Sequence, residues 1–238
     1  MKRFVVEEKV FETLPGYCLG VVAARGLDNG HGHEAVARRL DDAVGVFAEK
    51  FRDVNVRELP SVAAYRSAFT ALGMNPNKFM CSIEALTKRV QKSGHLPHIN
   101  PVVDLGNAFS LAYQLPMGAH DIDRLEACGM AIRFSSAQDH FLGMGEEKAE
   151  MMPEGELVYV SDHTVKTRRW IWRQSDDGKI TEQTSHVFFP IDAFENVNGK
   201  DAAQARDELA DFLRQEFSCE VWTGWIDREH PVFEFSWT

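Results

Sequence analysis

The stretch from Leu96 to Asp121 gathers the side chains that could do chemistry. It is mostly apolar, and apart from histidines its only charged residues are Asp104 and Asp121, although 26% of the chain is charged. Its polar side chains include His98, Asn100, Asp104, Asn107, Ser110, His120 and Asp121. A buried polar group without a partner costs on the order of 1–3 kcal/mol, so these groups must pair or line a cleft.

The chemistry that these residues support is hydrolysis by a positioned water. The chain has no G-x-S-x-G, C-x-x-C, P-loop or H-E-x-x-H motif, so nothing supports a covalent nucleophile. An activated ester needs only an oriented water and a donor for the developing oxyanion. Asn107 could donate this hydrogen bond, and His120 could act as a base near neutral pH. Asn100, Asp104 and Ser110 could hold the water and the helix face.

We therefore predict that Asn107, Ser110 and His120 line one cleft. The alternative is that Asp104 and Asn107 bond to the backbone at a helix crossing, which would give them a purely structural role.

A single helix must position most of these side chains. Asn100 can cap a helix and Pro101 suits its first position, so the sequence predicts a helix over 102–113. Polar residues three positions apart then share one face of this helix. Pro116 cannot continue the helix and Gly118 permits unusual backbone angles, which predicts a turn leading to His120.

A second stretch, Lys166–Arg173, is basic and rich in aromatic residues. If it is a strand, Arg168, Trp170 and Trp172 share one face, while Arg169 and Arg173 share the other. The first face could stack on the bases or the terminal ribose of an RNA. The alternative is a buried pair of tryptophans with arginines that are paired to nearby acids.

The net charge of -10 restricts binding of nucleic acid to a local basic patch, because phosphate contacts dominate such affinity. Any affinity for RNA should therefore be weak, and neither DNA nor a membrane is expected as a partner. Arg66 and Glu84 could form an ion pair beneath the cleft, or Arg66 could reach a carboxylate or phosphate of a substrate. The basic residues that follow Glu84, at positions 88, 89 and 92, are interpreted as a solvated helix face.

The order of elements predicts a single α+β domain over 1–238, with mostly antiparallel sheets and a helical layer. Helices are expected at 34–51, 60–72, 79–91, 102–113 and 202–216. Strands are expected at 4–10, 17–23, 129–134, 157–160, 166–173, 185–191, 219–223 and 232–237, and the last two should pair.

No metal, cofactor, membrane span or secretion signal is predicted. The four cysteines are far apart, and His31 and His33 have no third ligand nearby. No run of about 18 apolar residues occurs, so the expected location is the cytoplasm.

Three sequence words carry a resemblance to a known family. The run from Tyr65 to Ala193 includes SIEALTKRV, LPHINPVVDLGN and LPMGAHDIDRL. It resembles the B3/B4 editing module of the phenylalanyl-tRNA synthetase β chain, and more closely the free-standing proteins built from that module alone. The resemblance implies a layered α+β fold and a pocket in this region. No aminoacylation domain has a counterpart in the 238 residues.

The pocket residues of the synthetase module are matched only in part in this chain. Synthetase modules typically read DVTN followed by PMHAFD, with the Thr, Asn and His lining the pocket. Here Asn107 matches the Asn, while Gly106 and Gly118 stand in place of the Thr and the His. A Glu that recognises the tyrosine hydroxyl has no counterpart in 186–190. The resemblance therefore implies the location of the pocket, with Gly118 in its wall, and does not imply specificity for tyrosine. From their positions on the two preceding helices, Arg66 and Glu84 are further candidates for binding substrate.

Two functions stay open on this basis. The first is a trans-editing hydrolase that removes a wrong amino acid from tRNA. The second is a binding module, for RNA or a small aromatic compound, that keeps the fold without catalysis.

Overall fold

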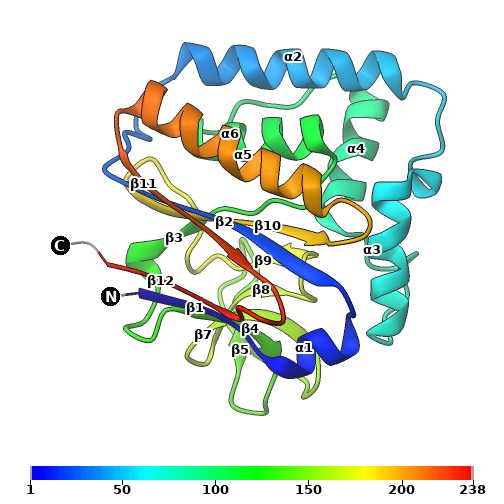
Figure 1. Cartoon of the computed structure of the whole chain (residues 1–238), viewed down its shortest axis with the longest axis vertical. Coiled ribbons are helices and arrows are strands. Elements are labelled where there is room, and N and C mark those ends of the chain that lie inside the picture. The colour runs from blue at the N-terminus through cyan, green and yellow to red at the C-terminus, as the bar shows by residue number, and fades with distance from the viewer. Residues whose placement is uncertain (1, 237–238) are drawn as a thin grey trace.

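A four-stranded antiparallel sheet forms the middle layer of the structure (Figure 1). The computed structural model describes residues 2–236. The sheet has the order β11 (Glu220–Ile226), β2 (Tyr17–Arg25), β10 (His186–Phe194) and β3 (His120–Asp121). Residues of β2 alternate between two cores. Val21 packs with Phe4 on one side of the sheet, and Val22 packs with Phe109 on the other. Both β2 and β10 are therefore apolar runs, as expected for strands buried on both faces.

A larger sheet packs against the middle layer. It contains β1 (Lys2–Val6), β4 (Met130–Phe134), β5 (His140–Phe141), β6 (Glu150–Met151), β7 (Leu157–Ser161), β8 (Thr164–Arg168), β9 (Arg173–Gln174) and β12 (Val232–Phe235). Its order is β12-β1-β4-β7-β8-β5-β6, and β9 pairs with β8. Only the β1–β4 and β5–β8 pairs are parallel among the described strands. At Gly129 a Cβ atom would lie 1.9 Å from the carbonyl oxygen of Arg3, so glycine is required where β4 approaches β1.

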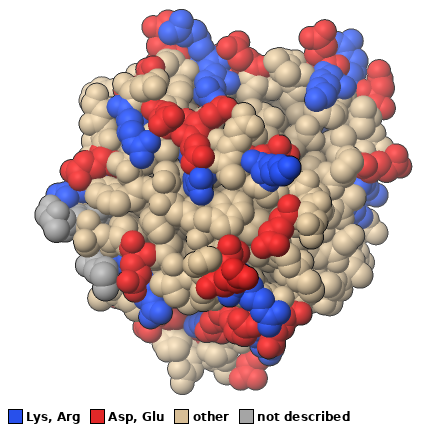
Figure 2. Space-filling model, in the orientation of Figure 1, with Lys and Arg blue, Asp and Glu red and all other residues tan. Residues whose placement is uncertain are grey.

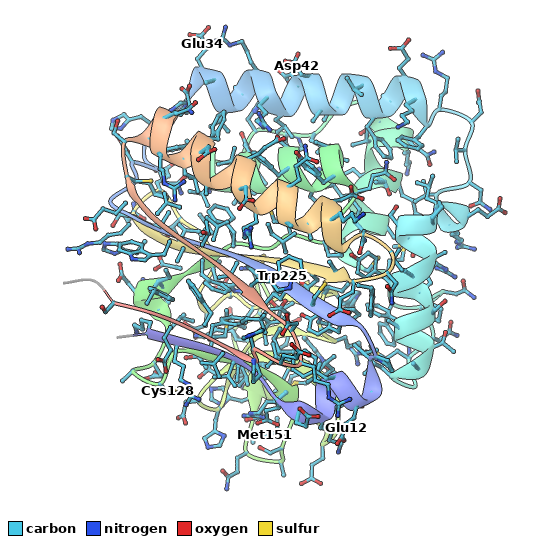
Figure 3. All side chains as sticks on the ribbon, in the orientation of Figure 1. Glu12, Glu34, Asp42, Cys128, Met151 and Trp225 are labelled. Carbon is cyan, nitrogen blue, oxygen red and sulfur yellow. The ribbon has the colours of Figure 1, made fainter. Side chains whose placement is uncertain are left out.

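The other face of the middle sheet is covered by α2 (Glu34–Lys50), α5 (Pro101–Tyr113) and α6 (Gly199–Phe217). Helix α1 (Glu8–Thr13) packs on β4 of the larger sheet. The remaining helical elements are α3 (Pro60–Ala71), α4 (Ser82–Ser93) and the 3-10 turns η1 (Val56–Glu58) and η2 (Ile122–Arg124). Figure 1 shows α2, α5 and α6 above the sheet and α3 and α4 together at one side. Glu34 and Asp42 point outward from α2, away from this layer (Figure 3). The predicted α+β class, with a helical layer over mostly antiparallel sheets, is confirmed.

Four predicted strands differ from the structure. The strand expected over 4–10 ends at Val6 and is followed by α1, because Val10 and Phe11 are buried while Glu8, Lys9 and Glu12 face solvent. The strand expected over 166–173 is broken between β8 and β9. The last two strands do not pair as predicted, because β11 joins β2 and β12 joins β1 in the other sheet. The end of the last predicted strand, Trp237, lies outside the described residues.

Candidate functional site

A pocket of about 160 Å³ opens between the two sheets and the start of α4. Four aromatic rings, those of His120, Tyr159, Trp170 and Trp172, contribute to its walls, and we call it the aromatic pocket. It is lined by Ser82, Pro116, Met117, Gly118, His120, Tyr159, Thr167, Trp170, Ile171, Trp172, Gln174, Pro190 and Asp192. Residues from β3, β7, β8, β10 and the turn after α5 thus meet at one place, which no single segment of sequence reveals.

Asp192 is the charged group of the aromatic pocket, and sequence reasoning missed it. Its Oδ1 accepts hydrogen bonds from the Tyr17 hydroxyl and the Trp170 Nε1–H, both at 2.6 Å, and from the Tyr159 hydroxyl at 2.7 Å. Among residues 2–236, its Oδ2 accepts a hydrogen bond only from the Tyr159 hydroxyl, at 2.7 Å. Burial raises the pKa of the Asp192 carboxyl to about 6 despite these donors. The available signal was one acid within the apolar run of β10, two residues beyond Pro190.

His120 lies in the same wall, and its ring stacks on Tyr159 with centroids 5.8 Å apart. The side chain is buried, and its Nδ1 has no hydrogen-bond partner among residues 2–236. Burial, followed by the charge of Lys166, lowers the pKa of His120 to about 3. The imidazole is therefore neutral at neutral pH and a weak base, which contradicts the expected role as a base near neutral pH. It can still exchange hydrogen bonds with a ligand.

A second pocket, of about 350 Å³, adjoins the aromatic pocket and contains Asn107. We call it the Asn107 pocket; Ile99, Val103, Gly106, Asn107, Met117, Gly118, Ala119, Met144, Gln174, Lys179 and Ile180 line it. The two pockets share Met117, Gly118 and Gln174. Asn107 is half-buried, and within the described chain its side chain makes no recorded hydrogen bond, so the amide is available to a ligand. Asn107 and His120 thus line neighbouring pockets with a common wall.

Other residues expected at this site hold the helix instead. The Asn100 side chain caps α5 by accepting from the Val103 N–H at 3.0 Å. Asp104 accepts from the Ile99 N–H and contacts His98, both at 2.9 Å. The buried Ser110 hydroxyl donates to the Leu115 carbonyl at 2.6 Å, so the prediction that Ser110 lines the cleft is wrong. Asp104 therefore bonds to the backbone of the segment that precedes its own helix.

Arg66 and Glu84 form the predicted ion pair. Arg66 Nη1 lies 3.0 Å from Glu84 Oε2 and also donates to the Pro76 carbonyl. Glu84 is fully buried, and neither residue lines either pocket.

The basic and aromatic stretch forms a turn, with Arg169 and Trp170 in left-handed backbone conformations at φ 50° and 59°. Trp170 is fully buried, and its backbone N–H donates to the Leu157 carbonyl at 2.6 Å. Arg168 and Arg169 both pair with Glu156, Arg168 also with Glu150, and Arg173 pairs with Glu146. The predicted face of one arginine and two tryptophans is therefore not formed. Trp172 alone remains half-buried at the mouth of the aromatic pocket.

Asp192→Asn should change how stability depends on pH. The folded-state pKa of about 6 lies above the ordinary value of 3.8, so ionisation is harder in the folded protein. The stabilising effect of Asp192 is complete below pH 4 and is lost as the pH rises to about 6, by on the order of 3 kcal/mol. The free energy of unfolding of the parent, measured with urea, should thus fall between pH 4 and 6.5 relative to that of the variant. Parallel pH profiles for the two proteins would contradict the assignment.

No group of three His, Cys, Asp or Glu residues within 2–236 is placed to hold a metal ion. Among the described helices, none has the length and apolar character needed to cross a membrane.

Comparison with known proteins identifies the family. A family model described as B3/4 domain matches residues 64–214. No curated protein matches the chain. Among solved structures, the chain is similar to an N-terminal fragment of the phenylalanyl-tRNA synthetase β-subunit from Pyrococcus horikoshii, with a TM-score of 0.50 and 9% identity over 92% of this chain and 49% of that one. The chain spans about half of that fragment, and the likeness concerns the fold. Since the family model covers more than half of its residues, the chain belongs to the B3/4 domain family.

Proposed function

We propose that the protein is a trans-editing hydrolase that removes a wrongly attached amino acid from tRNA. The observation that carries the proposal is the pair of adjoining pockets, one aromatic with buried polar groups and one with the free amide of Asn107. Membership of the B3/4 family, which is related to the editing module of phenylalanyl-tRNA synthetase, supports the same activity.

In this proposal the amino-acid side chain enters the aromatic pocket and the terminal ribose occupies the Asn107 pocket. The ester carbonyl then lies at the common wall of Met117, Gly118 and Gln174. Water attacks the carbonyl carbon, and the Asn107 amide donates a hydrogen bond to the oxyanion. The carbon–oxygen bond to the ribose breaks, and a proton from the water ends on the ribose hydroxyl. The products are free amino acid and uncharged tRNA.

The polar groups of the aromatic pocket favour a side chain that carries a hydrogen-bonding group. Within residues 2–236, Asp192 Oδ1 accepts three hydrogen bonds and Oδ2 accepts one. His120 Nδ1 makes no hydrogen bond in the same part of the chain. An amino acid with a hydroxyl or N–H at its end would satisfy these groups, whereas an apolar one would leave them unpaired. Discrimination against the apolar amino acid should follow.

The decisive experiment is to incubate the protein with a panel of mischarged tRNAs and follow release of the labelled amino acid. The panel should pair tyrosine with phenylalanine, and serine with alanine, since each pair differs by one hydroxyl. Faster release from one mischarged tRNA than in buffer alone supports the hydrolase. No release from any member, together with saturable binding of an amino acid, would support the binding module instead.

Gly118→Ala offers a test of the common wall. An added Cβ would lie 3.6 Å from His120 Nε2 and 3.7 Å from Pro190 Cγ, which are ordinary contacts, so the fold should tolerate it. The methyl group would project from the common wall, where the proposal places the ester carbonyl, and deacylation should fall by on the order of tenfold.

Gly45→Ala on α2 is the matched control, because a Cβ there would meet no atom within 4 Å. Its deacylation rate should equal that of the parent. If Gly118→Ala also matched the parent, the ester would not lie at this wall.

A further inference from the structure

Charge is distributed unevenly in this acidic protein. Residues 52–93, which include η1, α3 and α4, carry seven Lys or Arg and only three Asp or Glu, in a chain with a net charge of -10. Figure 1 shows α3 and α4 together at one edge of the molecule. The broad face shown in Figure 2 instead intersperses basic and acidic side chains. Residues 52–93 are therefore a block of the fold with an excess of basic side chains.

Within this block, three cations converge on one buried carboxylate. Arg66 Nη1 and Lys88 Nζ lie 3.0 and 2.5 Å from oxygens of Glu84, and Arg57 Nε lies 3.8 Å away. One negative charge cannot neutralise three positive ones. The side chains of Arg57 and Lys88 are 50% and 31% exposed, so the excess faces solvent. An anion bound there would complete the charge balance.

The basic block adjoins the mouth of the aromatic pocket. The Ser82 N–H, at the start of α4, donates to the Ile171 carbonyl at 2.8 Å, and Ser82 lines the pocket with Trp172. The Phe79 and Trp172 rings meet edge to face with centroids 5.1 Å apart. The Arg169 guanidinium lies 4.1 Å from the centre of the Phe79 ring and 4.6 Å from that of Trp172. Partly exposed aromatic rings thus stand between the cations and the pocket.

We propose that this face binds the single-stranded 3′ segment of the RNA whose terminal ester enters the pockets. The basic surface consists of Arg57, Lys78, Lys88, Arg89 and Lys92, and its aromatic edge of Phe79 and Trp172. Phosphates lie along the cations, and a base stacks at the edge, which is how single strands are bound without sequence specificity. The identity of the RNA rests on the proposed function. The basic surface takes the place of the arginines of 166–173, which are paired with acids, as the main contact with phosphate.

The test uses a triple variant, Arg57→Gln, Arg89→Gln and Lys92→Gln, in the full chain. All three side chains are exposed, and Arg66 and Lys88 remain to pair with Glu84. The control triple is Arg3→Gln, Lys200→Gln and Arg214→Gln, which removes the same charge from exposed positions elsewhere. The probe is an oligoribonucleotide of about ten residues that ends in CCA, which matches the size of a typical single-strand site.

The first triple variant should bind this probe at least tenfold more weakly than the parent at low salt, and the slope of log K against log salt should fall by about 2, since each phosphate contact on a single strand contributes about 0.7. The control should bind within about twofold of the parent. The proposal would be overturned if both triple variants lost binding equally, if the first triple variant bound like the parent, or if the parent did not bind the probe. Parent-like binding by the first triple variant would point to an acidic protein as the partner of this surface.

Deacylation separates this proposal from the proposed function. RNA binding that depends on the basic surface, without release of any amino acid, supports the surface and overturns the hydrolase. Release of amino acid at the parent rate by the first triple variant supports the hydrolase and overturns the surface.

Discussion

Asn107→Ala should slow the release of amino acid from mischarged tRNA by about tenfold to a thousandfold, the usual cost of losing one donor to an oxyanion. The Asn107 amide lines a pocket of about 350 Å³ and has no hydrogen-bond partner among residues 2–236, so it is free to donate to the oxyanion. The measurement is single-turnover deacylation, because it isolates the chemical step from release of tRNA.

The fold should be unaffected by this change. Alanine favours helix more than asparagine does, and no recorded hydrogen bond within the described chain is lost, so the melting temperature should stay the same or rise slightly. Asn196→Ala, at an exposed position that lines neither pocket, is the matched control and should retain the parent rate. A parent-like rate for Asn107→Ala would remove Asn107 from the mechanism.

Trp170→Ala should lower the free energy of unfolding by about 3–5 kcal/mol, as expected when a fully buried aromatic side chain is truncated. Its ring contacts those of Tyr17, Tyr65 and Phe69, so the truncation leaves a cavity at the junction of both sheets with α3. It also removes the Nε1–H donor to Asp192 Oδ1. Urea denaturation followed by circular dichroism measures the loss.

Trp172→Ala is the matched control for this prediction, because it removes the same side chain from a half-buried position two residues away. It should cost clearly less stability, and it should weaken RNA binding if Trp172 forms the aromatic edge. If Trp170→Ala does not fold, Trp170→Phe keeps most of the ring and should fold with an intermediate loss. Equal costs for the two alanine variants would contradict the burial that the structure assigns to them.

The local sequence was sufficient to predict an element where the signal for that element lies within one short segment. Asn100 and Pro101 predicted the start of α5, and the structure shows the Asn100 cap on the Val103 N–H. The apolar spacing of 34–51 predicted α2, which spans Glu34–Lys50. These signals depend on neighbours within one helical turn, so they are readable without knowledge of the fold. The words VVDLGN and PMGAHD likewise indicated the family.

Local sequence failed where contacts from distant segments decide the outcome. The alternation of 166–173 is typical of a strand, yet Arg169 and Trp170 adopt left-handed conformations that residues other than glycine rarely adopt. The Trp170 N–H donates to Leu157 and its indole donates to Asp192, and these two contacts hold the turn. Neither partner lies within eight residues of it in sequence.

The residues of the two pockets show the same division. The sequence by itself determined the α+β class, the family, and the helix that carries Asn107 toward a cleft. Only the tertiary structure decided that Asp192 belongs to the aromatic pocket, that Ser110 does not line the cleft and that His120 is a weak base. Each of these properties depends on burial and on partners from other strands, such as Tyr17 and Tyr159 for Asp192. Desolvation is set by the packing of distant segments, and no local pattern of residues encodes it.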